Sequence, residues 1–269
     1  MSIKVNNKQI EFFNFSGGEC HVSINGIDIR ERTFITAHLY SSDDVMRLLL
    51  TVDAVRRLNQ ETNIHLTIPY FPYARQDRVC NKGEAFSLSV MAGLINNLNC
   101  KKVVIYDPHS QVTIDQVNNC EVISQAEILL DSLVSEDIKE KGLILVSPDK
   151  GAANKTKDAA EKLGVEAIYC TKVRDVKTGQ ITGTHIPEGV TGKNFIIIDD
   201  ICDGGRTFTE LSKALKKEGA KDLYLYVTHG IFSKGLDVLK EHFEHVYCHH
   251  CFLESDAIDQ NFLSIIKEK

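Results

Sequence analysis

The stretch IIIDDICDGGRTFTE, residues 196–210, places an apolar run before two aspartates, a pair of glycines and a helix-like segment. Three consecutive isoleucines are typical of a strand buried on both faces of a parallel sheet. After the glycines, Phe208, Leu211 and Leu215 recur at helical spacing and mark one face of a helix that ends near Gly219. The stretch therefore predicts a strand, a tight turn and a helix, the repeating unit of an α/β fold.

The same alternation of apolar runs and amphipathic segments continues on both sides of this stretch. Strands are predicted at 33–40, 63–71, 101–107, 143–149, 165–170, 194–200 and 222–229, and helices at 87–98 and 155–164. A further helix follows Ser42, its predicted cap, because apolar residues recur at helical spacing from Val45 to Val55. We therefore expect two doubly wound α/β domains, 1–140 and 141–269, whose parallel sheets are covered on both faces.

Composition limits the classes of protein to which the chain can belong. Of its 269 residues, 43% are apolar and 25% are charged, which is ordinary for a globular protein. The net charge of −6 and the lack of a basic stripe argue against nucleic-acid binding. No apolar run approaches the roughly 20 residues of a membrane span, and the start MSIKVNNKQIEFF is unlike a signal peptide. The eight scattered cysteines predict reduced thiols in a cytoplasmic protein.

One pair of cysteines, Cys248 and Cys251, has the spacing of half a zinc site. A second half is not found elsewhere in the sequence. The residues of the segment VYCHHCFLE also fit a simple alternation along a strand. We favour the strand over the metal site.

Polar clusters follow four of the predicted strands. In open α/β sheets, ligands bind beyond the carboxyl ends of the strands. Asp and Gly are common turn formers, so any single cluster could serve only as a turn. Together the clusters carry basic, acidic and imidazole groups at one edge of each sheet, which predicts a ligand site. The clusters are PYARQDR (72–78), DPH (107–109), SPDKGAANK (147–155) and DDICDGGRT (199–207).

These clusters resemble, in order, the motifs of the ribose-phosphate pyrophosphokinase family, also called PRPP synthetase. The resemblance covers nearly the whole chain, and its motifs here are FSGGE (15–19), PYFPYARQDR (69–78), DPHSQ (107–111), SPDKGAANK (147–155), IIIDDICDGGRT (196–207) and THG (228–230). It implies two domains of the phosphoribosyltransferase type. It also implies a reaction in which the anomeric hydroxyl of ribose 5-phosphate attacks the β-phosphorus of ATP and AMP leaves.

For the sugar phosphate, the resemblance implies a role for the whole segment that follows the isoleucines. Asp199 and Asp200 would accept hydrogen bonds from the ribose 2- and 3-hydroxyls. The 5-phosphate would lie against backbone N–H groups at the start of the next helix, where the helix dipole favours an anion. Because neighbouring strand residues point to opposite faces, the chain must already turn at Asp200 if both carboxylates reach the sugar. The residues of the phosphate turn are Asp203, Gly204, Gly205, Arg206 and Thr207.

For the nucleotide, the resemblance implies a site in the first half of the chain. The residues that match its ATP-binding positions are Phe15, Glu19, Arg75, Gln76 and His109. Phe15 and Glu19 match a pair that a neighbouring subunit supplies, which implies a homo-oligomer. His109 and Asp149 match positions that hold Mg²⁺ on the triphosphate. Because Mg²⁺ prefers oxygen, we expect phosphate and water to fill most of its coordination shell.

Catalysis is expected from two cations, Lys172 and Arg174, in the segment YCTKVRDVKTGQITG. They match the lysine-x-arginine of the family. The transition state of phosphoryl-type transfer spreads charge over the oxygens, so positioned cations stabilise it. Alternation along a strand would direct both side chains to one side. The other interpretation is a solvated hairpin around Thr178 and Gly179.

The phosphate turn departs from the Thr-Gly/Ala-Gly-Thr pattern common in the family, and this leaves the acceptor open. Arg206 would suit a larger 5-phosphoribosyl acceptor such as ADP-ribose, because an arginine can bind a diphosphate through two parallel N–H bonds. Alternatively, it lies along the helix surface. A third function is that of a non-catalytic regulatory homologue. Retention of Lys172, Arg174, His109 and Asp149 argues against that function.

Overall fold

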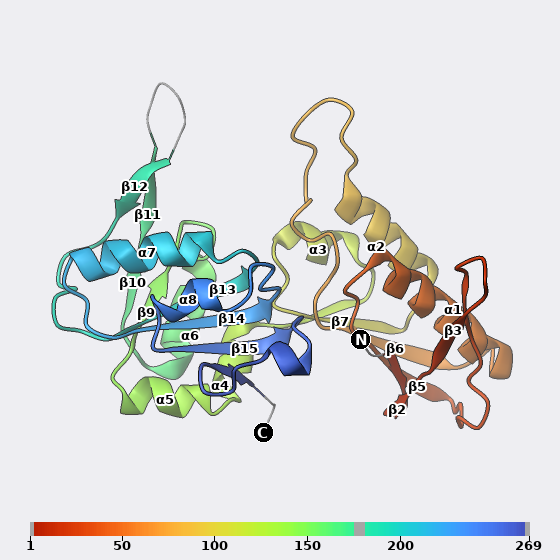
Figure 1. The fold of residues 1–269 in the computed structure, drawn as a ribbon. Helices are drawn as coiled ribbons and strands as arrows, with labels where there is room; N and C mark the ends of the chain where they lie inside the picture. Colours follow the sequence, from red (N-terminus) through yellow and green to blue (C-terminus); the bar gives the residue numbers. More distant parts are fainter. Residues whose placement is uncertain (1–2, 175–180, 267–269) are drawn as a thin grey trace. The chain divides into compact units, whose positions relative to one another are not determined.

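A computed structural model describes residues 3–174 and 181–266 of the chain. The chain divides into two compact units, Met1–Ile123 and Ser124–Lys269, and each is built around a six-stranded sheet (Figure 1). The expected α/β fold with two parallel-strand sheets is confirmed.

The sheet of the first unit has the strand order β2-β1-β5-β6-β7-β8. β1 pairs antiparallel with β2 and β5, whereas the strands from β5 to β8 are parallel. The strands are β1 (Ile3–Val5), β2 (Lys8–Gln9), β5 (Arg32–Ala37), β6 (Asn63–Ile68), β7 (Lys102–Tyr106) and β8 (Cys120–Ile123). The helices are α1 (Ser42–Leu58), α2 (Ser87–Asn97) and α3 (Gln111–Gln116). A separate antiparallel hairpin consists of β3 (Phe12–Asn14) and β4 (Cys20–Val22).

The helices of the first unit cover one face of its sheet. The strands from β5 to β8 follow one another in one direction across the sheet, so right-handed connections place α1, α2 and α3 on the same face. Burial along β5 agrees, because Ile35 and Ala37 are buried while Arg32 and Phe34 are exposed. A hollow of about 670 Å³ that includes Arg32, Phe34 and Thr36 lies on this open face. The expectation of helices on both faces therefore does not hold within this unit.

Helix α1 begins one residue earlier than the sequence suggested. Its cap is Ser41, whose hydroxyl accepts a hydrogen bond from the Asp44 N–H at 3.2 Å. The Asp44 carboxylate in turn accepts one from the Ser41 N–H at 2.9 Å. Only Ser41 has a carboxylate three residues later, as a capping box requires. Ser42, the predicted cap, is the first residue of the helix.

The sheet of the second unit has the order β10-β9-β13-β14-β15-β16, and every pair in it is parallel. The strands are β9 (Ile144–Ser147), β10 (Ala167–Tyr169), β13 (Phe195–Cys202), β14 (Leu223–Gly230), β15 (His245–Cys251) and β16 (Leu263–Ile265). The helices are α4 (Gln125–Leu130), α5 (Val134–Glu140), α6 (Ala153–Leu163), α7 (Arg206–Lys217) and α8 (Asp237–Lys240), with a short 3₁₀ turn, η1 (Ser255–Ala257).

This second sheet is covered on both faces, as expected of a doubly wound domain. Ile197 of β13 packs in the core that contains Phe208 and Leu211 of α7. Its neighbours Ile196 and Ile198 pack in the opposite core, with residues of α4, α5 and α6. The run of isoleucines thus has one helical layer on each side.

The boundary between the units falls after Ile123, whereas the sequence placed it near residue 140. The difference consists of α4 and α5. Leu129 of α4 and Ile138 of α5 lie in the same buried cluster as Leu163 of α6. These two helices therefore pack with the second unit rather than the first.

A two-stranded antiparallel sheet consists of β11 (Thr171–Arg174) and β12 (Ile181–His185). Thr178 and Gly179, where a hairpin was considered, lie outside the residues that the structure describes. Within residues 3–174 and 181–266, none of the helices has the length and apolar character that a transmembrane segment requires.

Candidate functional site

The two aspartates of the opening stretch lie near the carboxyl end of β13. The strand continues through Asp200 to Cys202, so the turn expected at Asp200 comes only after Cys202. The two residues nevertheless interact, because the backbone N–H of Asp200 donates a hydrogen bond to Asp199 Oδ1 at 2.9 Å. Asp200 is buried, and its Oδ2 lies 3.6 Å from Lys155 Nζ of α6. Sequence reasoning gave Lys155 no role, although it ends the SPDKGAANK cluster.

The acidic pair has unusual electrostatics. Burial raises the pKa of Asp199 well above its ordinary value, and the negative charge of Asp200 raises it further. Asp149, in the loop after β9, also raises the pKa of Asp199. The structure therefore brings three carboxylates together at the carboxyl ends of two neighbouring strands. Such an edge favours donors and cations as ligands.

The turn after β13 brings the chain round to helix α7. Gly205 has a φ of +77°, and a Cβ there would lie 3.1 Å from Leu239 Cδ2, so both conformation and space favour glycine. The Ser233 N–H donates to the Asp203 carbonyl at 3.1 Å and ties the turn to the segment that follows β14. This contact was not expected from the sequence.

The start of α7 has the form of an anion site. The N–H groups of Phe208 and Thr209 donate to the Gly205 carbonyl, each at 3.0 Å. In the part of the chain described, no side chain caps the helix before Arg206 and Thr207, both of which are exposed. The first turn of a helix carries unsatisfied N–H groups and a partial positive charge.

The backbone N–H of Gly205 is directed back at the thiol of Cys202, the last residue of β13. Burial raises the pKa of the Cys202 thiol to about 12, and the charges of Asp199 and Asp203 also raise it. A hydrogen bond from the Gly205 backbone N–H acts in the opposite direction. A Cβ added to Gly204 would lie 3.5 Å from Lys234 Cγ. The turn is therefore closely supported by residues 233–239.

Asp149 has a local structural role after β9. Its Oδ1 accepts hydrogen bonds from the N–H groups of Gly151 at 2.9 Å and Ala152 at 3.3 Å. The Ser147 hydroxyl donates to the Asp149 carbonyl at 2.8 Å. The carboxylate thus orders the loop before α6, and it also lies close enough to affect Asp199.

In the first unit, Asp77 lies where two loops, at the carboxyl ends of β6 and β7, approach each other. Burial alone would raise the pKa of Asp77, but the hydrogen bond from Arg78 Nε, at 2.9 Å, and the nearby Ser110 side chain bring it below its ordinary value. The charge of His109 acts in the same direction. The loop that holds the exposed Arg75 and Gln76 therefore lies close to the loop that holds His109. Asp77 was not singled out from the sequence.

The hairpin β3–β4 presents Phe15 and Glu19 at its tip. The Phe15 N–H donates to the Glu19 carbonyl at 2.9 Å, and both residues are exposed. The Phe15 ring is 53% exposed and lies 5.2 Å from Phe13 and 5.8 Å from His21, measured between ring centroids. The hairpin therefore carries an exposed aromatic cluster.

Lys172 and Arg174 lie on β11, whose backbone pairs with β12. Lys172 is opposite Thr184, and the register shifts between Val173 and Arg174. The side chains of both cations are outside the described part of the chain, so the expectation that they share one side stays a prediction.

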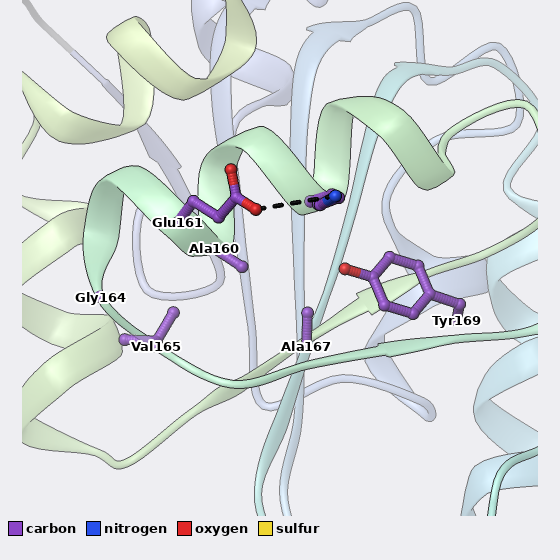
Figure 2. Close-up of a pocket in the computed structure, with 7 residues that line it drawn as sticks. Ala160, Glu161, Gly164, Val165, Ala167 and Tyr169 are labelled. Atoms are coloured by element: carbon purple, nitrogen blue, oxygen red, sulfur yellow. Dashed lines mark ion pairs between the residues drawn. The ribbon is translucent and has the colours of Figure 1, made fainter.

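A shallow pocket of about 370 Å³ lies between α6 and β10. Glu161 stands on its helix side and Tyr169 on its strand side (Figure 2). Lys157 Nζ and Glu161 Oε1, 3.8 Å apart, form an ion pair along its wall. The pocket contains none of the residues expected to bind ligand, and we assign it no function. Among the described residues, no group of three or more His, Cys, Asp or Glu is arranged to hold a metal ion.

Comparisons with known proteins agree with this architecture. Residues 1–98 match the N-terminal domain of ribose phosphate pyrophosphokinase, and residues 115–249 match the phosphoribosyl transferase domain. The fold is similar to that of phosphoribosylpyrophosphate synthetase from Mycobacterium smegmatis, with a TM-score of 0.79 at 23% identity over 95% of this chain and 85% of that one.

Relatives are similar in sequence over most of the chain. A ribose-phosphate pyrophosphokinase of Thermococcus kodakarensis is 34% identical over 84% of this chain and 79% of its own length. A second, from Ralstonia nicotianae, is 32% identical over 82% of this chain and 70% of its own length. The chain therefore belongs to the ribose-phosphate pyrophosphokinase family and is, like its relatives, a transferase.

Proposed function

We propose that the enzyme transfers the β,γ-diphosphate of ATP to the anomeric hydroxyl of ribose 5-phosphate. The hydroxyl oxygen forms a bond to the β-phosphorus, the bond from this phosphorus to the α-phosphate oxygen breaks, and the hydroxyl proton is released. The products are PRPP and AMP. The observation that supports this function best is the adjacency of Asp199 and Asp200 to a helix start that no described side chain caps.

The second unit has the chemistry to bind a sugar phosphate. Carboxylates accept hydrogen bonds from sugar hydroxyls, while backbone N–H groups at a helix start bind a phosphate. We assign the first function to Asp199 and Asp200, which interact with each other although the strand continues to Cys202, and the second to the segment from Asp203 to Thr207. Lys155 offsets part of the negative charge at Asp200, so a phosphorylated sugar can approach despite the acidic pair.

The residues available to Mg²⁺ fit a metal held mainly by its nucleotide. Mg²⁺ in such sites is held by one or two protein groups, with phosphates and water as the other ligands. Asp149 offers a carboxylate, of which one oxygen also accepts from Gly151 and Ala152. His109 offers an exposed imidazole. When bound, the metal would neutralise charge on the triphosphate.

ATP is assigned to Arg75, Gln76 and His109 of the first unit, and to Phe15 and Glu19 of a neighbouring subunit. The exposed ring of Phe15 offers a face for stacking a base. The backbone bond between Phe15 and Glu19 keeps these residues together at the hairpin tip. On this proposal the active enzyme is a homo-oligomer.

Lys172 and Arg174 are assigned to the stabilisation of charge in the transition state. As cations, both would donate hydrogen bonds to phosphoryl oxygens and stabilise the negative charge that these oxygens carry. Lys172 lies two residues after Cys170, which is buried and whose N–H donates to the Ser147 carbonyl of β9 at 3.0 Å. The start of β11 is therefore anchored to the sheet.

Labelled ATP tests this function directly. The enzyme is incubated with Mg²⁺, ribose 5-phosphate and ATP labelled either at the α- or at the γ-phosphorus. We expect the α-label in AMP and the γ-label in PRPP. A kinase that transfers one phosphoryl group would leave the α-label in ADP, and a non-catalytic regulatory homologue would leave both labels in ATP. Either result would contradict the proposal.

A further inference from the structure

Strained backbone occurs in three loops that follow strands of the two sheets. In the part of the chain that the structure describes, four asparagines have a positive φ, and so do Tyr73 (+61°), Asp107 (+41°) and Phe232 (+49°). These three lie in the loops after β6, β7 and β14. Asparagine and aspartate adopt the left-handed region more readily than other residues, whereas a bulky side chain there is an outlier. Such strain persists only where surrounding contacts hold it, and it is most frequent at functional sites.

The two strained aromatic residues are held in different ways. Phe232 is 2% exposed and belongs to the buried cluster that contains Leu239. Tyr73 is 38% exposed, so packing covers much less of its side chain. Its hydroxyl instead lies 2.8 Å from the hydroxyl of Ser42, the first residue of α1. This hydrogen bond attaches Tyr73 to a helix that is distant from it in sequence.

Tyr73 begins the turn that carries two residues assigned to ATP. The Gln76 N–H donates to the Tyr73 carbonyl at 2.9 Å, so Ala74 and Arg75 form the centre of the turn. The Gln76 carbonyl accepts from the Leu88 N–H at 3.3 Å, near the start of α2. The turn is therefore attached to α1 at one end, through Tyr73, and to α2 at the other.

Burial along the turn leaves two of its side chains open to a ligand. Ala74 and Asp77 are buried, whereas Arg75 and Gln76 are exposed. A rotation of the turn backbone would displace both exposed side chains together. Residues that bind a ligand keep their geometry only when further contacts hold their backbone. The conformation of Tyr73 therefore affects how both side chains meet a ligand.

We propose that Tyr73 is a positioning residue for ATP, through its hydrogen bond to Ser42. The bond holds Tyr73 in its strained conformation and thereby fixes the turn that presents Arg75 and Gln76. Tyr73 needs no contact with the nucleotide for this role. The inference rests on the proposed function, in which Arg75 and Gln76 bind ATP.

Two conservative substitutions remove little besides this hydrogen bond. Tyr73→Phe keeps the aromatic ring and loses only the hydroxyl. Ser42→Ala loses the partner hydroxyl and leaves the cap of α1 in place, because that cap is Ser41. A bond that only stabilised the fold would leave the ATP affinity of the folded protein unchanged. ATP affinity therefore distinguishes a positioning role from a structural one.

Hydrogen exchange of the ligand-free enzyme tests whether the bond orders the turn. In Tyr73→Phe and in Ser42→Ala, we expect the segment 73–79, which contains the Gln76 amide, to exchange about 2- to 5-fold faster. This is the lower part of the range for one hydrogen bond, because both hydroxyls are exposed. The amides of α7, in the second unit, should keep their wild-type rates. Unchanged exchange of 73–79 in both variants overturns the role of the bond.

Calorimetry of ATP binding in the presence of Mg²⁺ tests the positioning itself. Each single variant should raise the Kd of ATP by about 2- to 5-fold. The double variant should raise it no further, because both substitutions break the same bond. KM for ribose 5-phosphate should stay unchanged. Tyr169→Phe is the matched control and should keep the wild-type Kd, because Tyr169 is 39% exposed and belongs to the second unit.

The outcomes separate this role from the reaction. An unchanged Kd in both single variants overturns the positioning role, and so do effects of the two variants that multiply in the double variant. If the wild-type enzyme binds ATP but forms no PRPP, the proposed reaction fails while the Kd values still decide the role of Tyr73. A wild-type enzyme that binds no ATP overturns both.

Discussion

The backbone N–H of Asp200 donates a hydrogen bond to Oδ1 of Asp199, so one carboxylate of the pair is held against the strand that carries both. Asp200 is instead turned toward Lys155, whose Nζ lies 3.6 Å from its Oδ2. The two acidic side chains therefore differ in their partners. Burial, and then the negative charge of Asp200, disfavour the charge of Asp199 and raise its pKa.

Replacing Asp199 by Asn should stabilise the protein at alkaline pH. The pKa of Asp199 is raised in the folded protein by burial and by Asp200, so the folded state binds more protons than the unfolded state between the ordinary and the raised pKa. Stability is therefore lost as the pH rises through this window. Asn keeps the oxygen that accepts from Asp200. Melting temperatures at pH 5 and pH 8.5 should show a gain that is larger at pH 8.5, with lower activity.

An equal melting temperature of wild type and Asp199→Asn at both pH values would contradict this account. Glu161→Gln is a suitable control. Glu161 is exposed and belongs to a solvated i,i+4 pair, which is worth about 0.3–0.5 kcal/mol.

Two substitutions of Asp149 should distinguish its effect on stability from its effect on activity. In Asp149→Asn, Oδ1 still accepts from Gly151 and Ala152, so we expect stability to stay within about 0.5 kcal/mol of wild type. The lost charge should raise the Mg²⁺ requirement and lower turnover at least about tenfold. Asp149→Ala should in addition lose the loop contacts, at a cost of about 0.5–2 kcal/mol. Denaturant unfolding and turnover against Mg²⁺ measure both. Full turnover of Asp149→Asn at the wild-type Mg²⁺ requirement would remove Asp149 from the metal site.

The cations of β11 should act on turnover more than on ATP binding. Lys172→Ala or Arg174→Ala removes charge that is needed mainly in the transition state, so turnover should fall at least about a hundredfold. Binding of ATP, measured by calorimetry, should change little. Lys157→Ala is the matched control, because Lys157 is an exposed cation of the same unit. Either β11 variant that keeps more than half of wild-type turnover removes that residue from the mechanism.

The opening stretch could be read from sequence because its signals are strong and local. The strand predicted at 194–200 is observed at Phe195–Cys202, and Phe208 and Leu211 are buried on α7 as expected. A long apolar run followed by helical periodicity leaves few alternatives. In contrast, β2 has only two residues and β3 only three, which is too short for any periodicity to show.

Other features of the site depend on contacts between segments distant in sequence. Asp77 lies inside a recognised motif, but its burial and its closeness to Ser110 become visible only when two loops meet. Lys155 likewise has no signal until α6 is placed beside β13. Along β5, exposed Phe34 stands next to buried Ile35, as expected for a sheet that is covered on one face only. The sequence did not reveal this difference in burial, because both residues are apolar.

Gly230 and Gly93 should respond to alanine in opposite directions. A Cβ on Gly230 would lie 2.0 Å from Phe232 Cε2 and 2.7 Å from Cys248 Sγ, so we expect Gly230→Ala to destabilise the protein by about 1–3 kcal/mol or more. Gly93 is exposed inside α2 with nothing within 4 Å of its Cβ position. Gly93→Ala should stabilise by about 0.4–1 kcal/mol. Denaturant unfolding of both variants measures this, and a neutral Gly230→Ala would contradict the close packing of Gly230 against Phe232 and Cys248.

Arg206 should determine whether the enzyme accepts an esterified 5-phosphate. Arg206 is the first residue of α7 and is exposed beside the turn that ends at Gly205. A phosphate monoester needs no partner there, whereas the second phosphate of ADP-ribose projects out of the turn and could be bound by the guanidinium. This position favours ADP-ribose as a second candidate acceptor, with ADP-ribose pyrophosphate as the product.

Kinetics with both acceptors decide the role of Arg206. A hydrogen bond to a charged group is worth about 1.5–3 kcal/mol, or about 10- to 150-fold, so Arg206→Gly should lower kcat/KM for ADP-ribose by that factor. Turnover of ribose 5-phosphate should be unchanged, because its phosphate lies against backbone N–H groups. Arg206→Lys should recover only part of the loss, since an ammonium cannot form two parallel bonds. If the wild-type enzyme does not use ADP-ribose, or Arg206→Gly uses both acceptors as before, Arg206 lies along the helix surface and ribose 5-phosphate is the acceptor.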